Sequence, residues 1–240
     1  MKKRILAICI ALSALLMGCR DTQEEITVSA YEKAMEDGKI SIVIDAGHGL
    51  SDVGAINEEN LGDVTEADIN FAIASILCGY LTEKGYTVTM THDGKEKPDT
   101  EYDDGEATYG PTERADFSNS TDADIFLSIH CDSYPTNTDV YGTRLYYPTK
   151  TPNSSKYDEL LSYTIGDALN EAFPNDKEVI QKPMVGQDAY TVLYKTVVPS
   201  VLVECGFITN KDDAEKLKNA KWQESFAKAI ASGIDTYFAK

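Results

Sequence analysis

Basic residues are scarce in this chain of 240 residues, which has 22 lysines and arginines against 40 aspartates and glutamates. The formal net charge is therefore −18 at pH 7, and no stretch of the sequence forms a basic stripe. A chain with this charge repels the phosphates of nucleic acids and of anionic lipids. The composition thus argues against a nucleic-acid partner.

Cysteines are also few. Five occur in the whole chain, and four of them follow the first 18 residues, at positions 19, 78, 131 and 205. This number is too small for a fold held together by disulfides. Cys131 and Cys205 each follow a candidate site residue and could approach one another, but the sequence does not decide whether they pair.

Long apolar runs are limited to one, over residues 5–17. It follows the basic start Met1-Lys2-Lys3-Arg4, and it is shorter than the stretch of about 20 residues that spans a bilayer. These features are typical of an export signal. An ordinary secretory signal and an uncleaved anchor are both compatible with them.

The next residues, Leu16-Met17-Gly18-Cys19, resemble a bacterial lipobox, in which the chain is cleaved before the cysteine and the cysteine is lipidated. We therefore expect a lipoprotein signal peptide over residues 1–18 and a lipidated Cys19. A polar tether should follow over residues 19–38. The mature protein would be exported and held at the cell envelope by its lipid anchor, since attached acyl chains partition into the membrane.

From residue 39 onward, strand-like and helix-like patterns alternate along the chain. A strand, a helix and a second strand in that order indicate a parallel sheet with a right-handed crossover. We predict a single α/β domain over residues 39–240, with a largely parallel twisted central sheet of about six strands and helices on both faces. Strands are expected at 42–44, 86–91, 124–130, 140–147, 190–194 and 200–205, and the main helices at 63–84, 111–120, 155–173 and 222–238.

Two of the only three histidines follow apolar strand-like runs. His48 stands between Gly47 and Gly49 after the first strand, and we expect both glycines to take positive φ. His130 ends the strand at 124–130. Because parallel strands of α/β proteins place ligands at their carboxyl ends, the two imidazoles predict a metal site. Taken singly, each could instead be an ordinary polar residue with satisfied hydrogen bonds.

Two glutamates complete this constellation. A catalytic zinc commonly takes three protein ligands and leaves one position open, and Glu66 lies in the first helical turn after the His48 loop. The pattern Asp63-x-x-Glu66 could equally be a helix cap. Glu204 ends the apolar strand at 200–205, where an unpaired carboxylate is costly to bury. Beside a metal it could act as a general base, and otherwise it would be a glutamate in a salt bridge.

These residues carry a family resemblance. Asp45-Ala46-Gly47-His48-Gly49, Glu66, Ser128-Ile129-His130 and Val203-Glu204-Cys205-Gly206-Phe207 resemble the zinc-dependent N-acetylmuramoyl-L-alanine amidases, which are peptidoglycan hydrolases. The resemblance covers about residues 39–240. It implies one zinc ion bound by His48, Glu66 and His130, with Glu204 as the catalytic residue. The implied reaction is hydrolysis of the amide bond between N-acetylmuramic acid and L-alanine, in which a metal-bound water attacks and Glu204 serves as the general base.

Further residues are interpreted through the same resemblance. Asp45 and Arg114 are expected behind the metal ligands, with Arg114 in a structural role. The chain departs from the family pattern at Ala46, where proline is usual, at Asp132, where asparagine is usual, and at His92, where arginine is usual. We expect His92 to lie on the surface.

The partners expected from this interpretation are peptidoglycan as substrate and the membrane through the lipid anchor, with the protein itself a monomer. Two other functions are compatible with the same residues. One is a zinc peptidase that acts on stem peptides, and the other is a catalytically silent lipoprotein that binds the cell wall.

Overall fold

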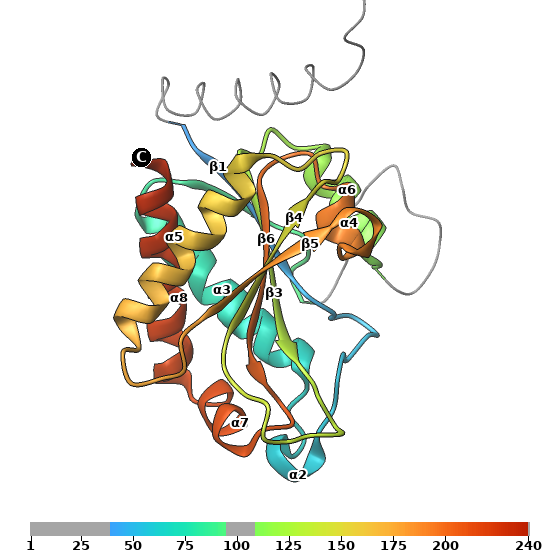
Figure 1. Ribbon diagram of the computed structural model, residues 1–240, viewed down its shortest axis with the longest axis vertical. Helices are drawn as coiled ribbons and strands as arrows, with labels where there is room; N and C mark the ends of the chain where they lie inside the picture. The colour runs from blue at the N-terminus through green and yellow to red at the C-terminus, as the bar shows by residue number, and fades with distance from the viewer. Residues whose placement is uncertain (1–38, 95–108, 240) are drawn as a thin grey trace, which may run out of the picture.

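A six-stranded sheet forms the centre of the protein, in a computed structural model that describes residues 39–94 and 109–239 (Figure 1). The strands lie side by side in the order β2-β1-β3-β6-β4-β5. Their bounds are β1 Ser41–Ala46, β2 Thr87–Met90, β3 Ile125–Asp132, β4 Arg144–Thr149, β5 Ile180–Val185 and β6 Ser200–Phe207.

The first four strands of this order are parallel to one another. β4 pairs with β6 in the antiparallel sense, and β5 is parallel to β4, so the last two strands run in the opposite direction. The predicted largely parallel sheet of about six strands is confirmed. As a result, β1, β3 and β6 end at one edge of the sheet, and β4 and β5 begin at that same edge.

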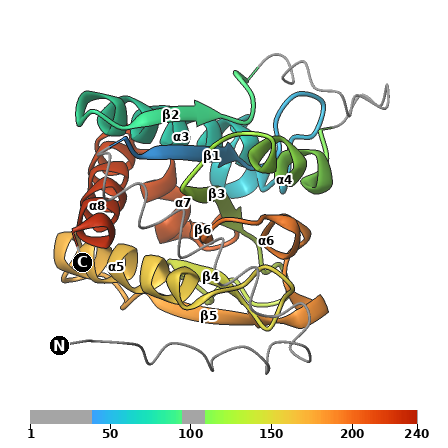
Figure 2. The ribbon, with the colours of Figure 1, turned by 90° about the horizontal axis from the view of Figure 1, so that it is seen from above.

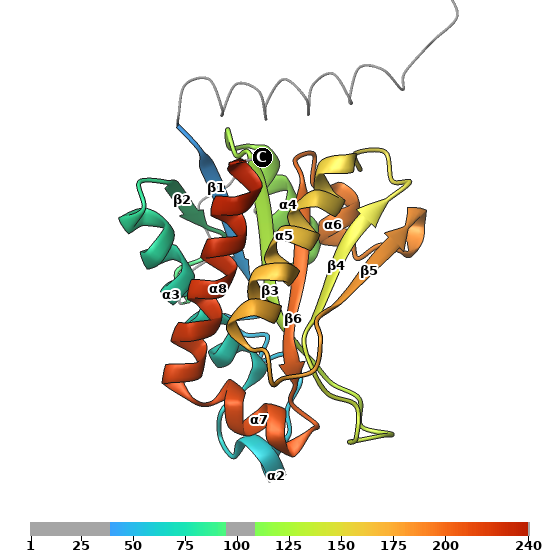
Figure 3. The ribbon, with the colours of Figure 1, turned by 60° about the vertical axis from the view of Figure 1, so that its left-hand side comes forward.

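Helices cover both faces of the sheet, as predicted (Figure 2). The long helices α3, α5 and α8 lie on one face, where α8 packs between the other two (Figure 3). The short helices α4 and α6 lie on the opposite face, and α2 and α7 lie near the edge where β6 ends. The helices are α2 Glu58–Leu61, α3 Glu66–Glu83, α4 Pro111–Asn119, α5 Lys156–Ala172, α6 Thr191–Lys195, α7 Lys211–Leu217 and α8 Ala220–Phe238, with a 3₁₀ turn at Gly186–Asp188.

Alternation along the strands divides their side chains between two cores. On β1, Ile42 and Ile44 belong to the larger core under α3, α5 and α8, whereas Val43 belongs to the smaller core under α4 and α6. The same alternation on β3 and β6 sends the side chains of His130 and Glu204 toward the smaller core's face. Asp45 on β1 shares that face. Strand periodicity therefore brings Asp45, His130 and Glu204 to one face of the sheet, whereas His48 lies in the loop after β1 and Glu66 lies on α3.

Some predicted elements were wrong. Residues 190–194 form helix α6 and not a strand, and the edge strand β5 was not predicted. Its sequence, Ile-Gln-Lys-Pro-Met-Val, lacks a continuous apolar run, and Pro183 is tolerated because β5 lies at the edge of the sheet. The strand expected at 140–147 runs over Arg144–Thr149 instead.

Other expectations lie outside the described residues. These are the signal peptide, Cys19, the tether, and most of the loop that follows Asp93. Within the ranges 39–94 and 109–239, no helix combines the length and the apolar character that crossing a bilayer would need.

Asp158 in the first turn of α5 gives a testable pH dependence. Its carboxylate accepts hydrogen bonds from the backbone N–H and hydroxyl of Ser155 and from the backbone N–H of Ser200. Burial nevertheless raises its pKa to about 7. The unfolded chain releases this proton near pH 4, so the folded chain holds one proton more between about pH 4 and pH 7. Stability is therefore lost as pH rises through this window, by up to about 4 kcal/mol from this group.

We expect the free energy of unfolding of the wild type to fall more steeply between pH 4 and pH 8 than that of the Asp158→Asn variant, whose amide does not titrate. Urea unfolding across this range measures both slopes. Equal slopes would contradict the prediction, because the general self-repulsion of an acidic chain is common to the two proteins.

Candidate metal centre

The loop after β1 places His48 by an unusual backbone conformation. His48 has φ 62°, Gly49 has φ 99° and Leu50 has φ 59°, so three consecutive residues are in the left-handed region. Such conformations are uncommon for residues other than glycine and persist only where the surroundings fix them. The expectation that Gly47 and Gly49 both take positive φ is thus right for Gly49 only. Gly47 has another role, described below.

Arg114 fixes this loop from α4. Its Nη1 donates to Asp45 Oδ1 and to the Ala46 carbonyl, both at 2.7 Å, and its Nη2 donates to the His48 carbonyl at 2.5 Å. Asp45 also accepts hydrogen bonds from the hydroxyls of Thr91 and Ser128. Burial opposes the ionisation of Asp45, but Arg114 and Ser128 outweigh it and lower the pKa of Asp45. Arg114 and Asp45 thus support the His48 loop and do not reach the ligand cluster.

The prediction that His92 lies on the surface is wrong. Its side chain is 3% exposed, stacks on Phe71 at 5.8 Å between ring centroids, and makes a 2.7 Å contact from Nε2 to the Ala46 carbonyl. The backbone N–H of Gly94 donates to Nδ1 of His92, which makes Nε2 the protonated nitrogen. His92 therefore supports the end of β1, as Arg114 does. The sequence did not predict this, because a single histidine after a strand is compatible with either a buried or an exposed position.

Three predicted residues converge at the carboxyl ends of β1 and β3. His48 Nε2 lies 3.3 Å from Glu66 Oε1, and His130 Nδ1 lies 3.2 Å from the same oxygen. The two imidazole rings meet edge to face at 5.0 Å between centroids. One ligand atom from each of the three residues lies within 4.8 Å of the other two. Residues from the β1 loop, α3 and β3 therefore form one cluster.

Glu66 is held rigidly within this cluster. It is 3% exposed, its Oε2 accepts a hydrogen bond from the Ala55 N–H, and its Oε1 accepts from the Cys131 N–H and from Asn70 Nδ2. Burial opposes its ionisation, but the two histidines outweigh this and lower the pKa of Glu66 well below its ordinary value. The helix cap that the Asp63-x-x-Glu66 pattern also allowed is made by Thr65 and Asp68 instead.

The donor set fits zinc. Two imidazole nitrogens and one carboxylate oxygen make up a common catalytic zinc set, with bonds of about 2.0–2.2 Å and a fourth position left open. In a tetrahedron with such bonds, neighbouring ligand atoms lie about 3.3–3.6 Å apart. The observed separations of 3.2 and 3.3 Å from Glu66 Oε1 are close to this spacing.

Asp52 orients the first histidine, and sequence reasoning missed it. Its Oδ2 lies 2.8 Å from Nδ1 of His48, so Nε2 is turned toward Glu66. A ligand histidine commonly donates its other ring N–H to a carboxylate in this way. Burial alone would lower the pKa of His48, but Glu66 and Asp52 raise it to about 9. The sequence feature that could have indicated this role is the position of Asp52 four residues after His48, in the same loop.

Gly47 provides the space in which the His130 ring lies. A Cβ atom on Gly47 would come within 2.2 Å of Cε1 and Nε2 of His130. We expect Gly47→Ala to displace the ring and to lower zinc affinity by about tenfold to a hundredfold, the range seen when the support of a ligand is lost. A competition titration with a chelating dye measures this.

Gly79→Ala is the matched control, because no atom outside the backbone of its own helix lies within 4 Å of a Cβ at that position. It should bind zinc as the wild type does. If the two variants bind zinc equally well, Gly47 does not hold the ring in place.

Glu204 lies beside the cluster, on the strand next to His130. The two residues are direct partners in the β3–β6 register. The Glu204 side chain is buried, and its Oε2 has no hydrogen-bond partner among the described residues. Burial, Asp132 and Glu66 raise the pKa of Glu204 well above its ordinary value, while Arg144 acts in the opposite direction. A buried carboxyl group without a partner is positioned to exchange a proton with a bound molecule.

Cys131 and Cys205 follow these two residues on β3 and β6. Both thiols are buried and neither forms a disulfide. Burial and the neighbouring Cys205 raise the pKa of Cys131 well above its ordinary value, which keeps this thiol protonated and unreactive.

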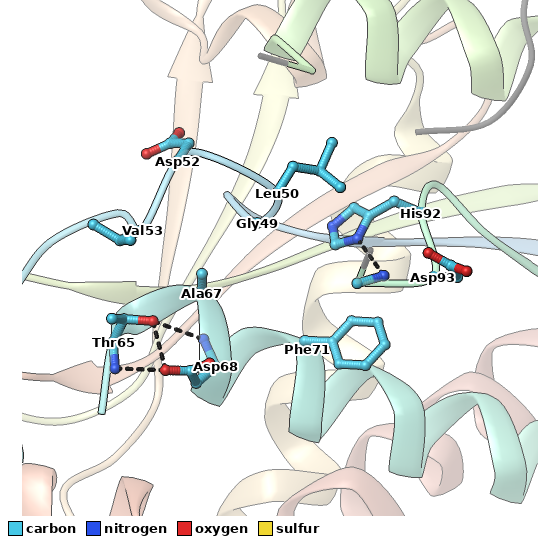
Figure 4. Close-up of a pocket in the computed structure, with 11 residues that line it drawn as sticks. Gly49, Leu50, Asp52, Val53, Thr65, Ala67, Asp68, Phe71, His92 and Asp93 are labelled. Atoms are coloured by element: carbon cyan, nitrogen blue, oxygen red, sulfur yellow. Dashed lines mark hydrogen bonds between the residues drawn. The ribbon is translucent and has the colours of Figure 1, made fainter. Parts of the chain in front are cut away.

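On its other side, the His48 loop borders a hollow of about 340 Å³ (Figure 4). The loop forms one wall, the start of α3 forms another, and Phe71 with His92 closes the far end. Three carboxylates line it, from Asp52, Asp68 and Asp93, and no lysine or arginine of residues 39–94 and 109–239 does. The described lining of the hollow is therefore anionic.

Comparison with known proteins adds to this geometry. Residues 42–236 match the family described as N-acetylmuramoyl-L-alanine amidase. The chain is 30% identical over 235 residues to the uncharacterized protein YqiI of Bacillus subtilis, with 98% of this chain and 97% of that protein covered. It is also 30% identical over 243 residues to the N-acetylmuramoyl-L-alanine amidase AmiC of Escherichia coli, with 86% of this chain but only 55% of that protein covered. The chain thus spans about half the length of AmiC.

The fold has solved counterparts. The structure of the N-acetylmuramoyl-L-alanine amidase AmiC2 of Nostoc punctiforme superposes with a TM-score of 0.68 at 27% identity, covering 85% of this chain and 99% of that one.

Proposed function

The chain belongs to the N-acetylmuramoyl-L-alanine amidase family and is an amidase of the hydrolase class, and we propose that it cleaves the amide bond between N-acetylmuramic acid and the L-alanine of the peptidoglycan stem peptide. The observation that carries this proposal is the convergence of His48, Glu66 and His130 beside the unpartnered carboxyl group of Glu204.

In this proposal, His48, Glu66 and His130 hold one zinc ion. When bound, zinc supplies a Lewis acid that polarises the amide carbonyl and favours attack by water at neutral pH. Asp52 and Gly47 keep the two imidazoles in their orientations, while Arg114 and Asp45 hold the loop that carries His48. These residues together preorganise the site, so little rearrangement is needed when the substrate arrives.

Glu204 performs the proton transfers. As a carboxylate it takes a proton from the attacking water, and as a carboxylic acid it gives that proton to the departing nitrogen of L-alanine. Its buried position and raised pKa support the second role, because they favour retention of the proton until the amine leaves.

The test is to identify the products formed on purified peptidoglycan, with and without a chelator. We expect complete stem peptides that begin with L-alanine, detected by mass spectrometry, and no product in the chelated sample until zinc is restored. Fragments cut within the stem peptide would instead indicate a zinc peptidase. Retention on the wall without any product would indicate a binding lipoprotein.

We also propose that the protein acts at the cell envelope as a monomer, tethered through a lipid on Cys19 after removal of residues 1–18. Metabolic labelling with a palmitate analogue tests this. Label should appear on the wild type and be absent from Cys19→Ala.

A further inference from the structure

Two cationic side chains lie beyond Glu204, on the side away from the zinc ligands. In the sheet register, His130 is the partner of Glu204, and Glu204 is the partner of Arg144 on β4. Two residues along the strands, Leu202 pairs with Tyr146, and Tyr146 pairs with Lys182 on β5. Neighbouring strands are about 4.8 Å apart. Arg144 is therefore one strand, and Lys182 two strands, away from the strand of Glu204.

Arg144 is held in place with part of its hydrogen-bonding capacity unused. Its guanidinium carbon lies 4.4 Å from the centroid of the Phe207 ring, and its Nη1 lies 3.2 Å from Asp132 Oδ2. Its Nε is buried and has no partner within the described part of the chain. A guanidinium fixed in this way presents a planar set of donors, which suits a carboxylate.

Lys182 extends this cationic surface over aromatic rings. Its Nζ lies 5.5 Å from the centroid of the Tyr146 ring, which in turn meets the Tyr190 ring edge to face at 5.3 Å. No ion pair of Lys182 with a carboxylate occurs among residues 39–94 and 109–239. Tyr190 is 40% exposed although it is a large aromatic residue. The four side chains form one partly open surface next to the candidate active site.

The role proposed for Glu204 determines which part of the substrate faces this surface. The inference therefore rests on the proposed function. Glu204 gives its proton to the departing nitrogen, and the peptide attached to that nitrogen must lie on the Glu204 side of the zinc ligands. Continuing away from His130, the next side chains are those of Arg144, Tyr146 and Lys182.

We propose that Arg144 and Lys182 bind a carboxylate of the stem peptide, with Tyr146 and Tyr190 packing against its backbone. The second residue of a stem peptide is a D-glutamate joined through its side chain, which leaves its α-carboxylate free. That group lies one to two residue lengths from the scissile nitrogen, or about 4–7 Å. This span matches the one strand spacing between Glu204 and Arg144, and Lys182 lies one strand further on.

The charge around the site favours the same assignment. The hollow beside the His48 loop is lined by Asp52, Asp68 and Asp93, and the chain as a whole has a net charge of −18. A substrate carboxylate is repelled by both. Among the described residues around Glu204, Arg144 and Lys182 offer it compensating charge, and Asp132 is already paired to Arg144.

The test compares two synthetic muropeptides that differ only in this group, one with the free α-carboxylate and one with the α-carboxamide. We expect the wild type to cleave the carboxylate form with a kcat/KM about tenfold to a hundredfold higher, as a charge-assisted contact gives. Arg144→Gln and Lys182→Gln should each reduce the ratio between the two kcat/KM values, mainly by raising the KM for the carboxylate form. Arg144→Lys should retain part of the preference, and Lys221→Gln, a change of equal charge at an exposed position on α8, should retain all of it.

Each other outcome counts against the inference. Equal cleavage of the two peptides by the wild type would overturn the carboxylate site but leave the amidase function standing. Cleavage of neither peptide would overturn both. If Arg144→Gln and Lys182→Gln slow both peptides equally, the two side chains have a structural role only.

Discussion

Replacing Glu204 with glutamine should lower kcat for amide hydrolysis by about a thousandfold, within the range of 10² to 10⁴ that proton transfer by a positioned side chain contributes. The amide cannot accept the proton of water or return it to the departing nitrogen. Because Glu204 is not among the three clustered ligand residues, zinc content should remain at one ion per chain. Hydrolysis of a muropeptide and metal analysis of the same preparation measure the two effects.

Glu171→Gln is the matched control, since Glu171 is exposed on α5, which packs on the opposite face of the sheet from Glu204. It should have wild-type activity. An active Glu204→Gln protein would remove Glu204 as the proton carrier. A Glu204→Gln protein that has lost its zinc would show that the residue helps to hold the metal.

Replacing His130 with alanine should abolish zinc binding and reduce activity by at least about a thousandfold, because metal catalysis supplies several kcal/mol of transition-state stabilisation. His130 is one of the three candidate ligands, and its side chain is only 20% exposed. Its removal empties part of a mostly buried position, so the fold of the variant has to be measured together with its zinc content. Near-ultraviolet circular dichroism checks the fold, and metal analysis counts the zinc.

Chelated wild type serves as the comparison for this variant. It should lose activity to the same degree and regain it when zinc is added, whereas the His130→Ala protein should stay inactive. A variant that retained one zinc ion per chain would contradict the assignment of this ligand.

The meeting of the two candidate histidine ligands at one sheet edge could be predicted, because strand periodicity and parallel pairing are encoded locally. His48 and His130 each follow an apolar run, and parallel strands bring their ends to one edge. Glu66 and Glu204 were ambiguous on sequence alone, and the family resemblance pointed to their roles. The role of a buried carboxylate is hard to predict from sequence when its partners lie far along the chain.

The supporting residues could not be predicted, because they depend on contacts across long sequence separations. His92 was expected on the surface and lies 3% exposed against the Ala46 carbonyl. Strand β5 was missed because an edge strand needs no apolar run, and so the position of Lys182 beyond Glu204 was not foreseen. Asp52 lies in a polar loop, and only its position four residues after His48 distinguishes it from the other acidic residues there.

Because β4 and β5 run in the opposite direction to β1, β3 and β6, the candidate metal ligands and the proposed substrate-binding residues come from different parts of the chain at the same edge of the sheet. The side chains that would bind the ion come from the β1 loop, from α3 and from the last residues of β3. Arg144 is instead the first residue of β4, which runs in the opposite direction. The connection that leads into β4 can therefore lengthen, shorten or change charge without moving a ligand. With the roles proposed above, a change in this connection would alter substrate preference and leave the hydrolytic reaction unchanged.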